Sequence, residues 1–175
     1  KPLYISCMGV IFMFGKLTNK LTEETKIYVF FIVLCEAAGI VSGLISMAGM
    51  RNFSDVMQSE LTPPGIVFPV VWTVLYALMG IGAARVCLAS ESLEQMKGIL
   101  IFAVQLAVNF FWSIVFFNFR AFQFAFWWLV LLWIAVILMI VTYMKVARTA
   151  SWLQLPYLIW VTFAGYLSYM AWMMN

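Results

Sequence analysis

Amide and indole side chains that could contact a small molecule recur at helical spacing inside long apolar stretches. Gln105, Asn109 and Trp112 have the i, i+4, i+7 spacing of a single helical face. Helical rise of about 1.5 Å per residue brings Trp72 and Trp160 to a similar depth in their own stretches. An amide inside an aromatic layer indicates a small-molecule cavity. Interhelical hydrogen bonding by the amides, and helix packing by the indoles, are the alternatives that this spacing leaves open.

Glu36 is a carboxylic acid near the middle of an apolar stretch. An ionised carboxylate in hydrocarbon is costly, so we expect it to be protonated, paired or facing a wet cavity. Because no basic residue is predicted at its depth, a protonated acid hydrogen-bonded to a neighbour such as Gln105 is favoured over an ion pair. A proton site and a polar ligand contact are both open interpretations.

Several classes of catalytic chemistry find no support in the sequence. It contains no histidine, which is the commonest general base and the usual ligand of metals and haem. It also has no phosphate-binding loop, Ser-His-Asp triad, HExxH motif or pair of acid/base carboxylates. Cys7, Cys35 and Cys87 lack CxxC spacing and are interpreted as small core hydrophobes. We expect no metal site and no required cofactor.

The stretches that carry these residues are those of a membrane protein. Of 175 residues, 66% are hydrophobic and 10% charged, whereas a soluble domain is about half apolar and a quarter charged. The pattern predicts an all-α integral membrane protein, a bundle of five transmembrane helices in contact with the lipid bilayer. The predicted spans cover residues 27–50, 62–88, 98–119, 121–144 and 152–174. Because the basic residues lie at the ends of these spans, nucleic acid is not an expected partner.

Two signals mark the predicted starts of spans. Thr62 has the residue type of an N-cap, and Pro63 would follow in the first turn, where its missing N–H is no loss. Pro156 has a similar place near the start of the last span. Within the first span, Gly39 and Gly43 form a GxxxG motif, which predicts close packing either inside the bundle or against a second copy.

The chain is predicted to have two parts. Residues 27–175 form the five-helix membrane domain. Residues 1–26 contain the apolar segment 3–15, which is too short to span a bilayer and precedes a polar stretch. We interpret residues 1–26 as an interfacial or signal-like N-terminal extension outside the core fold.

Basic residues predict the orientation of the spans, because Lys and Arg are retained on the cytoplasmic side. Only Arg51 and Arg120 fall on one side of the predicted membrane. The following basic residues fall on the other side: Lys16, Lys20, Lys26, Arg85, Lys97, Lys145 and Arg148. The N-terminal side of the first span is therefore predicted to be cytoplasmic and the C-terminus outside.

Three separate motifs resemble one known family. LTPPGIVFPVVWTVLYALMGIGAARV (61–86) is similar to the second span of the TspO/translocator protein family, also called tryptophan-rich sensory proteins or peripheral-type benzodiazepine receptors. QLAVNFFWSIVFF (105–117) and LPYLIWVTFAGYLSYMAWMMN (155–175) resemble its third and fifth spans, in the right order and at the right separation. The resemblance covers about residues 27–175.

The resemblance implies a five-helix bundle, often dimeric, with a pocket for porphyrins, sterols and isoquinoline ligands. The loop after the first span, here about Arg51 to Leu61, would cover that pocket. Some members degrade porphyrins under light, using tryptophans that match Trp72 and Trp160. The pocket residues carried over to this chain are Trp72, Tyr76, Asn109, Trp112, Trp160 and Ala164.

The chain departs from the family pattern at the pocket rim and at its C-terminal end. Leu61 and Ile66 stand where tryptophan is usual, Pro69 comes one position early, and Ser113-Ile114 replaces a proline-containing pair. No Arg or Lys follows Tyr169, so the sterol motif is incomplete and sterol is the less favoured ligand.

Three functional hypotheses follow from the sequence. The leading one is a membrane receptor or sensor that binds a flat hydrophobic ligand, above all a tetrapyrrole such as porphyrin or haem, between its helices. The second is a light- and oxygen-dependent porphyrin-degrading enzyme that uses Trp72 and Trp160. The third, a porphyrin or sterol transporter with Glu36 as coupling acid, ranks last because no inverted repeat is visible.

Overall fold

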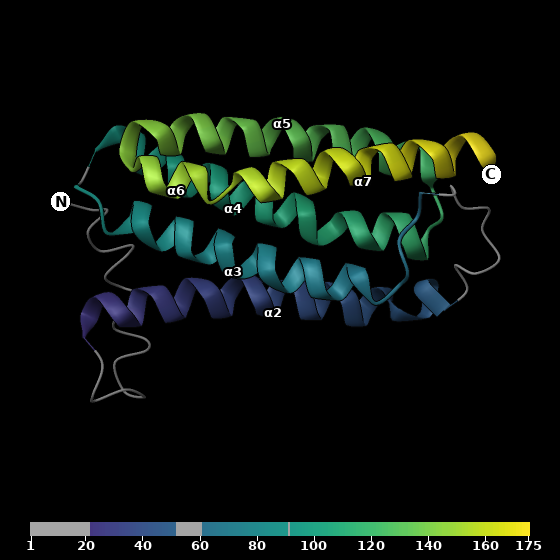
Figure 1. Ribbon diagram of the computed structural model, residues 1–175, viewed down its shortest axis with the longest axis horizontal. Coiled ribbons are helices and arrows are strands. Elements are labelled where there is room, and N and C mark those ends of the chain that lie inside the picture. The colour runs from purple at the N-terminus through teal and green to yellow at the C-terminus, as the bar shows by residue number, and fades with distance from the viewer. Residues whose placement is uncertain (1–21, 52–60, 91) are drawn as a thin grey trace.

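The computed structural model describes residues 22–51, 61–90 and 92–175 of the chain. Five long helices lie side by side and alternate in direction (Figure 1). They are α2 (Glu23–Arg51), α3 (Val67–Cys87), α4 (Leu93–Ser113), α5 (Phe122–Val146) and α7 (Leu155–Met174). Two short elements complete them, the π-helix η2 (Ile114–Asn118) and the helix α6 (Arg148–Trp152).

The outer surface of the bundle is apolar. Leu44, Leu100 and Ile159 are 59%, 62% and 70% exposed, on three different helices. Four of the described helices, α2, α3, α4 with η2, and α5, are long and apolar enough to cross a bilayer. The fifth, α7, has 20 residues and is therefore about 30 Å long, the thickness of a hydrocarbon core. The predicted all-α, five-helix membrane bundle is confirmed.

Three spans begin four or five residues away from the predicted start. Helix α2 begins at Glu23, one turn before residue 27. Helix α3 begins at Val67, so the prediction of Thr62 as its N-cap is wrong, because a residue before proline is disfavoured in helical conformation. Helix α4 begins at Leu93 instead of residue 98, since Ser92 caps it and its Oγ accepts a hydrogen bond from the Gln95 N–H at 3.0 Å.

Two predicted spans are not continuous α-helices. The third changes at Ile114 into the π-helix η2, which ends at Asn118. The fifth is preceded by the separate short helix α6, and a turn separates α6 from α7. Pro156 lies in the first turn of α7, as predicted, because its missing N–H has no intrahelical partner there.

Glycines set the distance between α2 and α3. A Cβ on Gly80 would lie 2.7 Å from the Cα of Ile32, so the two backbones touch at this point. Gly39 lies directly against the ring of Tyr76 on α3. A Cβ on Gly43, one turn further along α2, would meet no atom within 4 Å, so this glycine faces open space. The first glycine of the GxxxG motif therefore packs inside the bundle.

The remaining helices close the bundle on the other side. Helix α5 packs against α4 and α7, and α2 packs against α3 and η2. Helices α3 and α7 meet at only a few places. The helices therefore surround a space between α2, α3, α4 and α7 that α5 does not reach.

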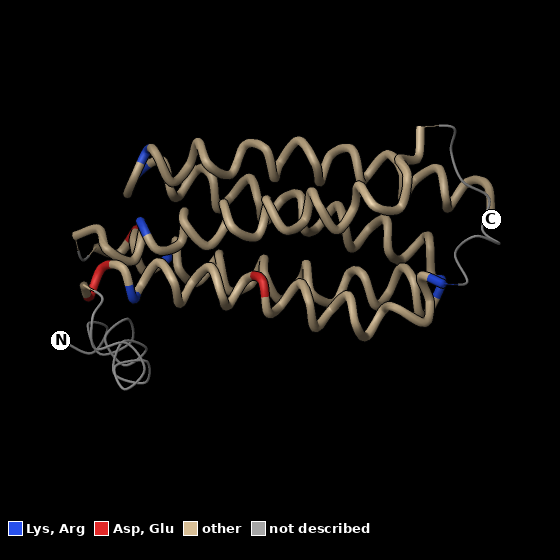
Figure 2. The backbone as a smooth tube through the Cα atoms, turned by 60° about the horizontal axis from the view of Figure 1, so that its bottom comes forward, with Lys and Arg blue, Asp and Glu red and all other residues tan. Residues whose placement is uncertain are grey.

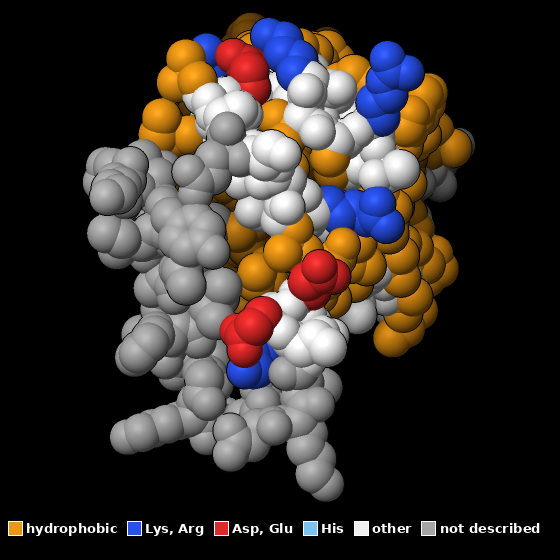
Figure 3. Space-filling view, turned by 90° about the vertical axis from the view of Figure 1, so that its left-hand side faces the viewer, with side chains coloured by type: hydrophobic (Ala, Val, Ile, Leu, Met, Phe, Trp, Pro, Cys, Tyr) orange, Lys and Arg blue, Asp and Glu red, His pale blue; other side chains and the backbone are white. Residues whose placement is uncertain are grey.

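Charged residues gather at the two ends of the bundle, apart from one acidic position near its middle, as Figure 2 shows. At one end Lys26 pairs with Glu23, and Lys97 and Lys145 both approach Glu94. Seen from this end, hydrophobic side chains form the flanks around the charged group (Figure 3). Arg51, the last residue of α2, and Arg120, between η2 and α5, lie at the opposite end. For the described basic residues the ends match the two sides assigned from the sequence, and Lys16 and Lys20 lie outside the described residues. Which end is cytoplasmic stays a prediction.

The contact at Gly80 generates a prediction about stability. We expect Gly80→Ala to lower the free energy of unfolding by about 1–3 kcal/mol, because the added methyl group forces the backbones of α2 and α3 apart. SDS-induced unfolding in mixed micelles, followed by circular dichroism, measures this change.

Gly165→Ala is the matched control. Both substitutions gain the same helix propensity, but a Cβ at Gly165 would lie 3.7 Å from the nearest atom of Leu129, an ordinary contact. Equal stabilities of the two variants would contradict the role assigned to Gly80.

Candidate ligand-binding cavity

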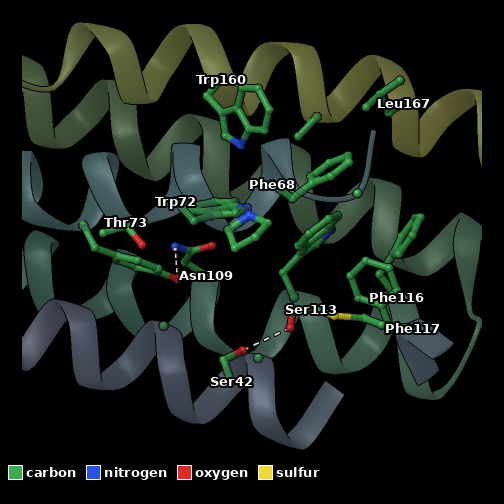
Figure 4. A pocket seen from close by; sticks show the side chains of 18 of the residues that line it. Ser42, Phe68, Trp72, Thr73, Asn109, Ser113, Phe116, Phe117, Trp160 and Leu167 are labelled. Carbon is green, nitrogen blue, oxygen red and sulfur yellow. Dashed lines mark hydrogen bonds between the residues drawn. The ribbon is translucent and has the colours of Figure 1, made fainter. Parts of the chain in front are cut away.

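A cavity of about 710 Å³ lies among α2, α3, α7 and the junction of α4 with η2 (Figure 4). It occupies the half of the bundle that holds the C-terminal ends of α2, α4 and α7. Most residues predicted to contact a ligand line it: Glu36, Trp72, Tyr76, Asn109, Trp112, Trp160 and Ala164. Gln105 alone among the predicted contacts is not part of the lining.

The wall on α3 is a pair of stacked aromatic rings. Trp72 and Tyr76 are one helical turn apart, and their ring centroids lie 5.4 Å from each other with an interplanar angle of 30°. Tyr157 packs edge-on against Trp72 at 6.2 Å. Asn109 on α4 donates a hydrogen bond from Nδ2 to the hydroxyl of Tyr76 at 3.2 Å. These contacts hold both rings in place at the edge of the cavity.

Trp112 offers its ring, and not its N–H, to the cavity. Its Nε1–H donates to the backbone carbonyl of Ala125 on α5 at 3.1 Å, which ties α4 to α5. The indole stacks on Phe116, with ring centroids 5.2 Å apart. Because the polar atom of this indole is already paired, Trp112 can contribute only apolar and aromatic contact to a ligand.

The wall on α7 contains two polar atoms without partners among the described residues. Trp160, Ala164 and Ser168 follow at intervals of one turn and all line the cavity. Both Nε1 of Trp160 and Oγ of Ser168 are buried, and neither has a hydrogen-bond partner in the part of the chain that the structure describes. The indole nitrogen of Trp160 points toward the cavity in Figure 4. A ligand with acceptor atoms could pair both groups.

Gln105 lies behind the cavity wall and joins three helices. Its Nε2 donates to the sulfur of Met79 on α3 at 2.9 Å, and its Oε1 accepts from the hydroxyl of Tyr157 on α7 at 3.1 Å. The geometry thus supports the interhelical alternative for Gln105. The predicted hydrogen bond between Gln105 and Glu36 is wrong, because Tyr157 and Met79 occupy both ends of the amide.

Glu36 lines the cavity from α2. Its carboxyl group has no ion pair or hydrogen bond to any part of the chain that the structure describes. Among the described residues of the lining, none is Lys or Arg. The described walls therefore combine one acidic group with neutral polar and aromatic ones.

A group of serines near the cavity was not identified from the sequence. Ser42 donates to the backbone carbonyl of Phe110 at 2.7 Å, and the hydroxyl groups of Ser42 and Ser46 contact Ser113 at 3.1 and 2.7 Å. These bonds join α2 to α4, and Ser42 and Ser113 also line the cavity (Figure 4). The i, i+4 spacing of Ser42 and Ser46 in an apolar helix was the available signal.

The departures from the family pattern lie at different places around the cavity. Pro69 and Ser113 are part of the lining, whereas Leu61 and Ile66 are not. The loop predicted to cover the pocket falls largely at residues 52–60, which lie outside the described residues.

No metal centre is formed by the described residues, in which no three His, Cys, Asp or Glu side chains gather. Cys35 is a free, buried thiol, in agreement with its interpretation as a core residue. Cys87 is also buried in the core, but it is disulfide-bonded, which the sequence did not predict. Cys7 lies outside the described residues.

Comparison with known proteins places this chain in a family. The sequence model of the TspO/MBR family matches residues 31–173, which include all five long helices except the first turns of α2 and the end of α7. The chain belongs to the TspO/MBR family. The resemblance seen in the three sequence motifs is confirmed.

Individual members of the TspO/MBR family match along most of the chain. Protein CrtK of Rhodobacter capsulatus is 35% identical over 85% of this chain and 92% of its own. A tryptophan-rich protein TspO of Chlorobaculum tepidum is 33% identical over 79% of this chain and 89% of its own. The translocator protein of Bos taurus is 30% identical over 73% of this chain and 76% of its own. The matches therefore extend over most of each relative as well as most of this chain.

The bond between Gln105 and Tyr157 can be tested by a double-mutant cycle. Gln105→Leu and Tyr157→Phe should each destabilise the protein, because each leaves a buried polar atom unpaired. The double variant should lose less stability than the sum, with a coupling energy of about 0.6–1.7 kcal/mol. SDS-induced unfolding of the four proteins gives this value.

A second double-mutant cycle serves for comparison and uses Thr162→Val and Trp133→Phe. It measures a hydrogen bond that is more exposed than the one between Gln105 and Tyr157, because the indole of Trp133 donates to Thr162 at 2.9 Å near the surface. Additive effects of Gln105→Leu and Tyr157→Phe would show that their hydrogen bond does not hold the helices together.

Proposed function

We propose that this chain is a membrane receptor or sensor that binds a flat hydrophobic ligand, a tetrapyrrole above all, in the cavity between its helices. The observation that carries the proposal is the pair of polar atoms without partners among the described residues, Trp160 Nε1 and Ser168 Oγ, inside an aromatic cavity. Polar groups buried without partners are rare in native proteins, and a bound molecule is one way to satisfy them.

The size and walls of the cavity suit a flat molecule. Its volume of about 710 Å³ falls within the range of about 300–1,000 Å³ that pockets for small ligands occupy. Trp72 on α3, which stacks on Tyr76, lies across the cavity from Trp160 on α7 (Figure 4), and Phe68 packs edge-on against Trp160 at 5.9 Å. Aromatic faces of this kind favour a planar ring system over a branched aliphatic one.

The absence of histidine from the sequence bears on the kind of tetrapyrrole. A haem iron is commonly held by a histidine, and this chain has none. A porphyrin needs no axial ligand and can be bound through its faces and its edge. We therefore place porphyrin before haem, and sterol after both, because the cavity offers planar aromatic walls.

Two further properties belong to this proposal, one implied by the family resemblance and one by the basic residues of the sequence. One is a homodimer, for which the apolar outer faces of the helices provide surface. The other is the orientation with the N-terminal side of α2 in the cytoplasm, which the distribution of basic residues supports.

Binding can be tested by titrating the purified protein with protoporphyrin and following the fluorescence of the porphyrin itself. We expect Trp160→Phe to raise the dissociation constant by about tenfold, since it keeps an aromatic ring but removes the N–H. The double variant Trp72→Phe, Trp160→Phe should bind still more weakly.

Trp127→Phe is the control for these variants, because Trp127 is 57% exposed and does not line the cavity. Its dissociation constant should equal that of the wild type. If all four proteins bind protoporphyrin equally well, the ligand is not in this cavity and the proposal fails.

A second candidate function is light-driven oxidation of the bound porphyrin by oxygen. The observation that favours it is that Trp72 and Trp160, the two tryptophans it requires, line the same cavity. An indole close to a photoexcited macrocycle can exchange an electron with it, without a metal or a general base.

This activity predicts that illumination in air bleaches the porphyrin absorption band faster with the wild type than with detergent alone. The double variant Trp72→Phe, Trp160→Phe should bleach at the detergent rate, while Trp127→Phe should match the wild type. Equal rates with and without protein would exclude the enzymatic function and leave binding intact.

A further inference from the structure

A carboxyl group faces the cavity from the middle of α2. Glu36 lies 13 residues after Glu23 and 15 before Arg51, the two ends of α2, so each end is about 20 Å away along the helix. Between Lys26 and Arg51, Glu36 is the only charged residue of α2. The depth places Glu36 near the middle of a membrane.

The other charged groups of the described chain are too far along the bundle to neutralise Glu36. The ion pairs among the described residues, Lys26 with Glu23 and Glu94 with Lys97 and Lys145, lie at one end. The described part of the cavity lining contributes no cation. A carboxylate at this depth is stable only with a partner, and the described chain supplies none.

Glu36 borders the aromatic wall against which a flat ligand would stack. It lies one turn before Gly39, and Gly39 touches the ring of Tyr76. Helices α2 and α7 are on opposite sides of the cavity (Figure 4). The hydrogen-bond acceptor Glu36 therefore faces, across the cavity, the side that carries the N–H of Trp160 and the hydroxyl of Ser168.

We propose that Glu36 recognises a protonated amine on the ligand, so that the cavity selects flat aromatic molecules that carry one basic nitrogen at their edge. The inference rests on the proposed binding function and specifies its ligand class. The ammonium group of the ligand donates to the carboxylate of Glu36, while the rings stack on Trp72 and Tyr76. A charge-assisted hydrogen bond is about twice as strong as a neutral one, so the amine governs the preference among ligands with the same ring.

The test compares two porphyrins that differ only at one substituent. One carries a single aminomethyl group, and the other carries the same group acetylated on nitrogen, which removes its charge. Both are titrated into the full-length protein in an uncharged detergent at neutral pH, with porphyrin fluorescence as the signal. We expect the wild type to bind the amine about tenfold or more tightly than the acetylated compound.

Glu36→Gln keeps the size and polarity of the side chain but removes its charge. This variant should bind the aminomethyl porphyrin more weakly than the wild type does, and its affinity for the acetylated porphyrin should be unchanged. The preference for the amine should therefore disappear. Glu36→Asp should keep part of the preference. Glu24→Gln is the matched control, because Glu24 is an exposed acid at the start of the same helix, and this variant should behave like the wild type.

The other possible outcomes distinguish failure of the proposed binding function from failure of the role proposed for Glu36. If neither porphyrin binds the wild type, the proposed binding function fails. If both bind the wild type equally, or if the preference survives in Glu36→Gln, binding stands and the role of Glu36 is overturned. Loss of both porphyrins in Glu36→Gln would show that Glu36 supports the bundle and does not recognise an amine.

Discussion

No water reaches the hydrocarbon core of a bilayer, so every polar group inside this bundle must find its partner within the protein or in a ligand. Most of the described side chains obey this constraint. The indoles of Trp112 and Trp128 donate to backbone carbonyls, and Gln105 is paired at both ends of its amide. Among the described residues four buried polar atoms lack partners, and two of them, in Trp160 and Ser168, line the cavity. Half of these unpaired atoms therefore lie at the cavity, where a ligand could reach them.

The cavity exists because α2 and α3 pack closely in one half of the bundle and separate in the other. Gly80 brings the backbones of α2 and α3 into contact, while Gly43 and Gly65 face open space. Residues 61–66 precede the start of α3 and are not helical, which leaves room beside the C-terminal part of α2. The aromatic walls, the polar groups on α7 and the acid on α2 therefore meet around one cavity.

Much of this arrangement follows from the sequence. Helical spacing and the family motifs together indicated Trp72, Tyr76, Asn109, Trp112, Trp160 and Ala164, which all line the cavity. Helical spacing could not decide which polar residues are hydrogen-bonded within the protein, because their partners come from distant segments. The hydroxyl of Tyr157, for example, donates to the amide oxygen of Gln105, which lies 52 positions away in the sequence. It also missed the start of α4 at Leu93, since polar residues that look like a loop can form a capped first turn.

The π-helix Ile114–Asn118 has a consequence for the evolution of this chain. A π-helical turn holds about one residue more than an α-helical turn, and such turns are frequent at functional sites. Removing that residue would rotate every following side chain by about 100°, including Phe116 and Phe117, which line the cavity. The length of this segment, and not only its composition, therefore determines which side chains line the cavity at η2. A chain that was one residue shorter there would present different side chains to the cavity.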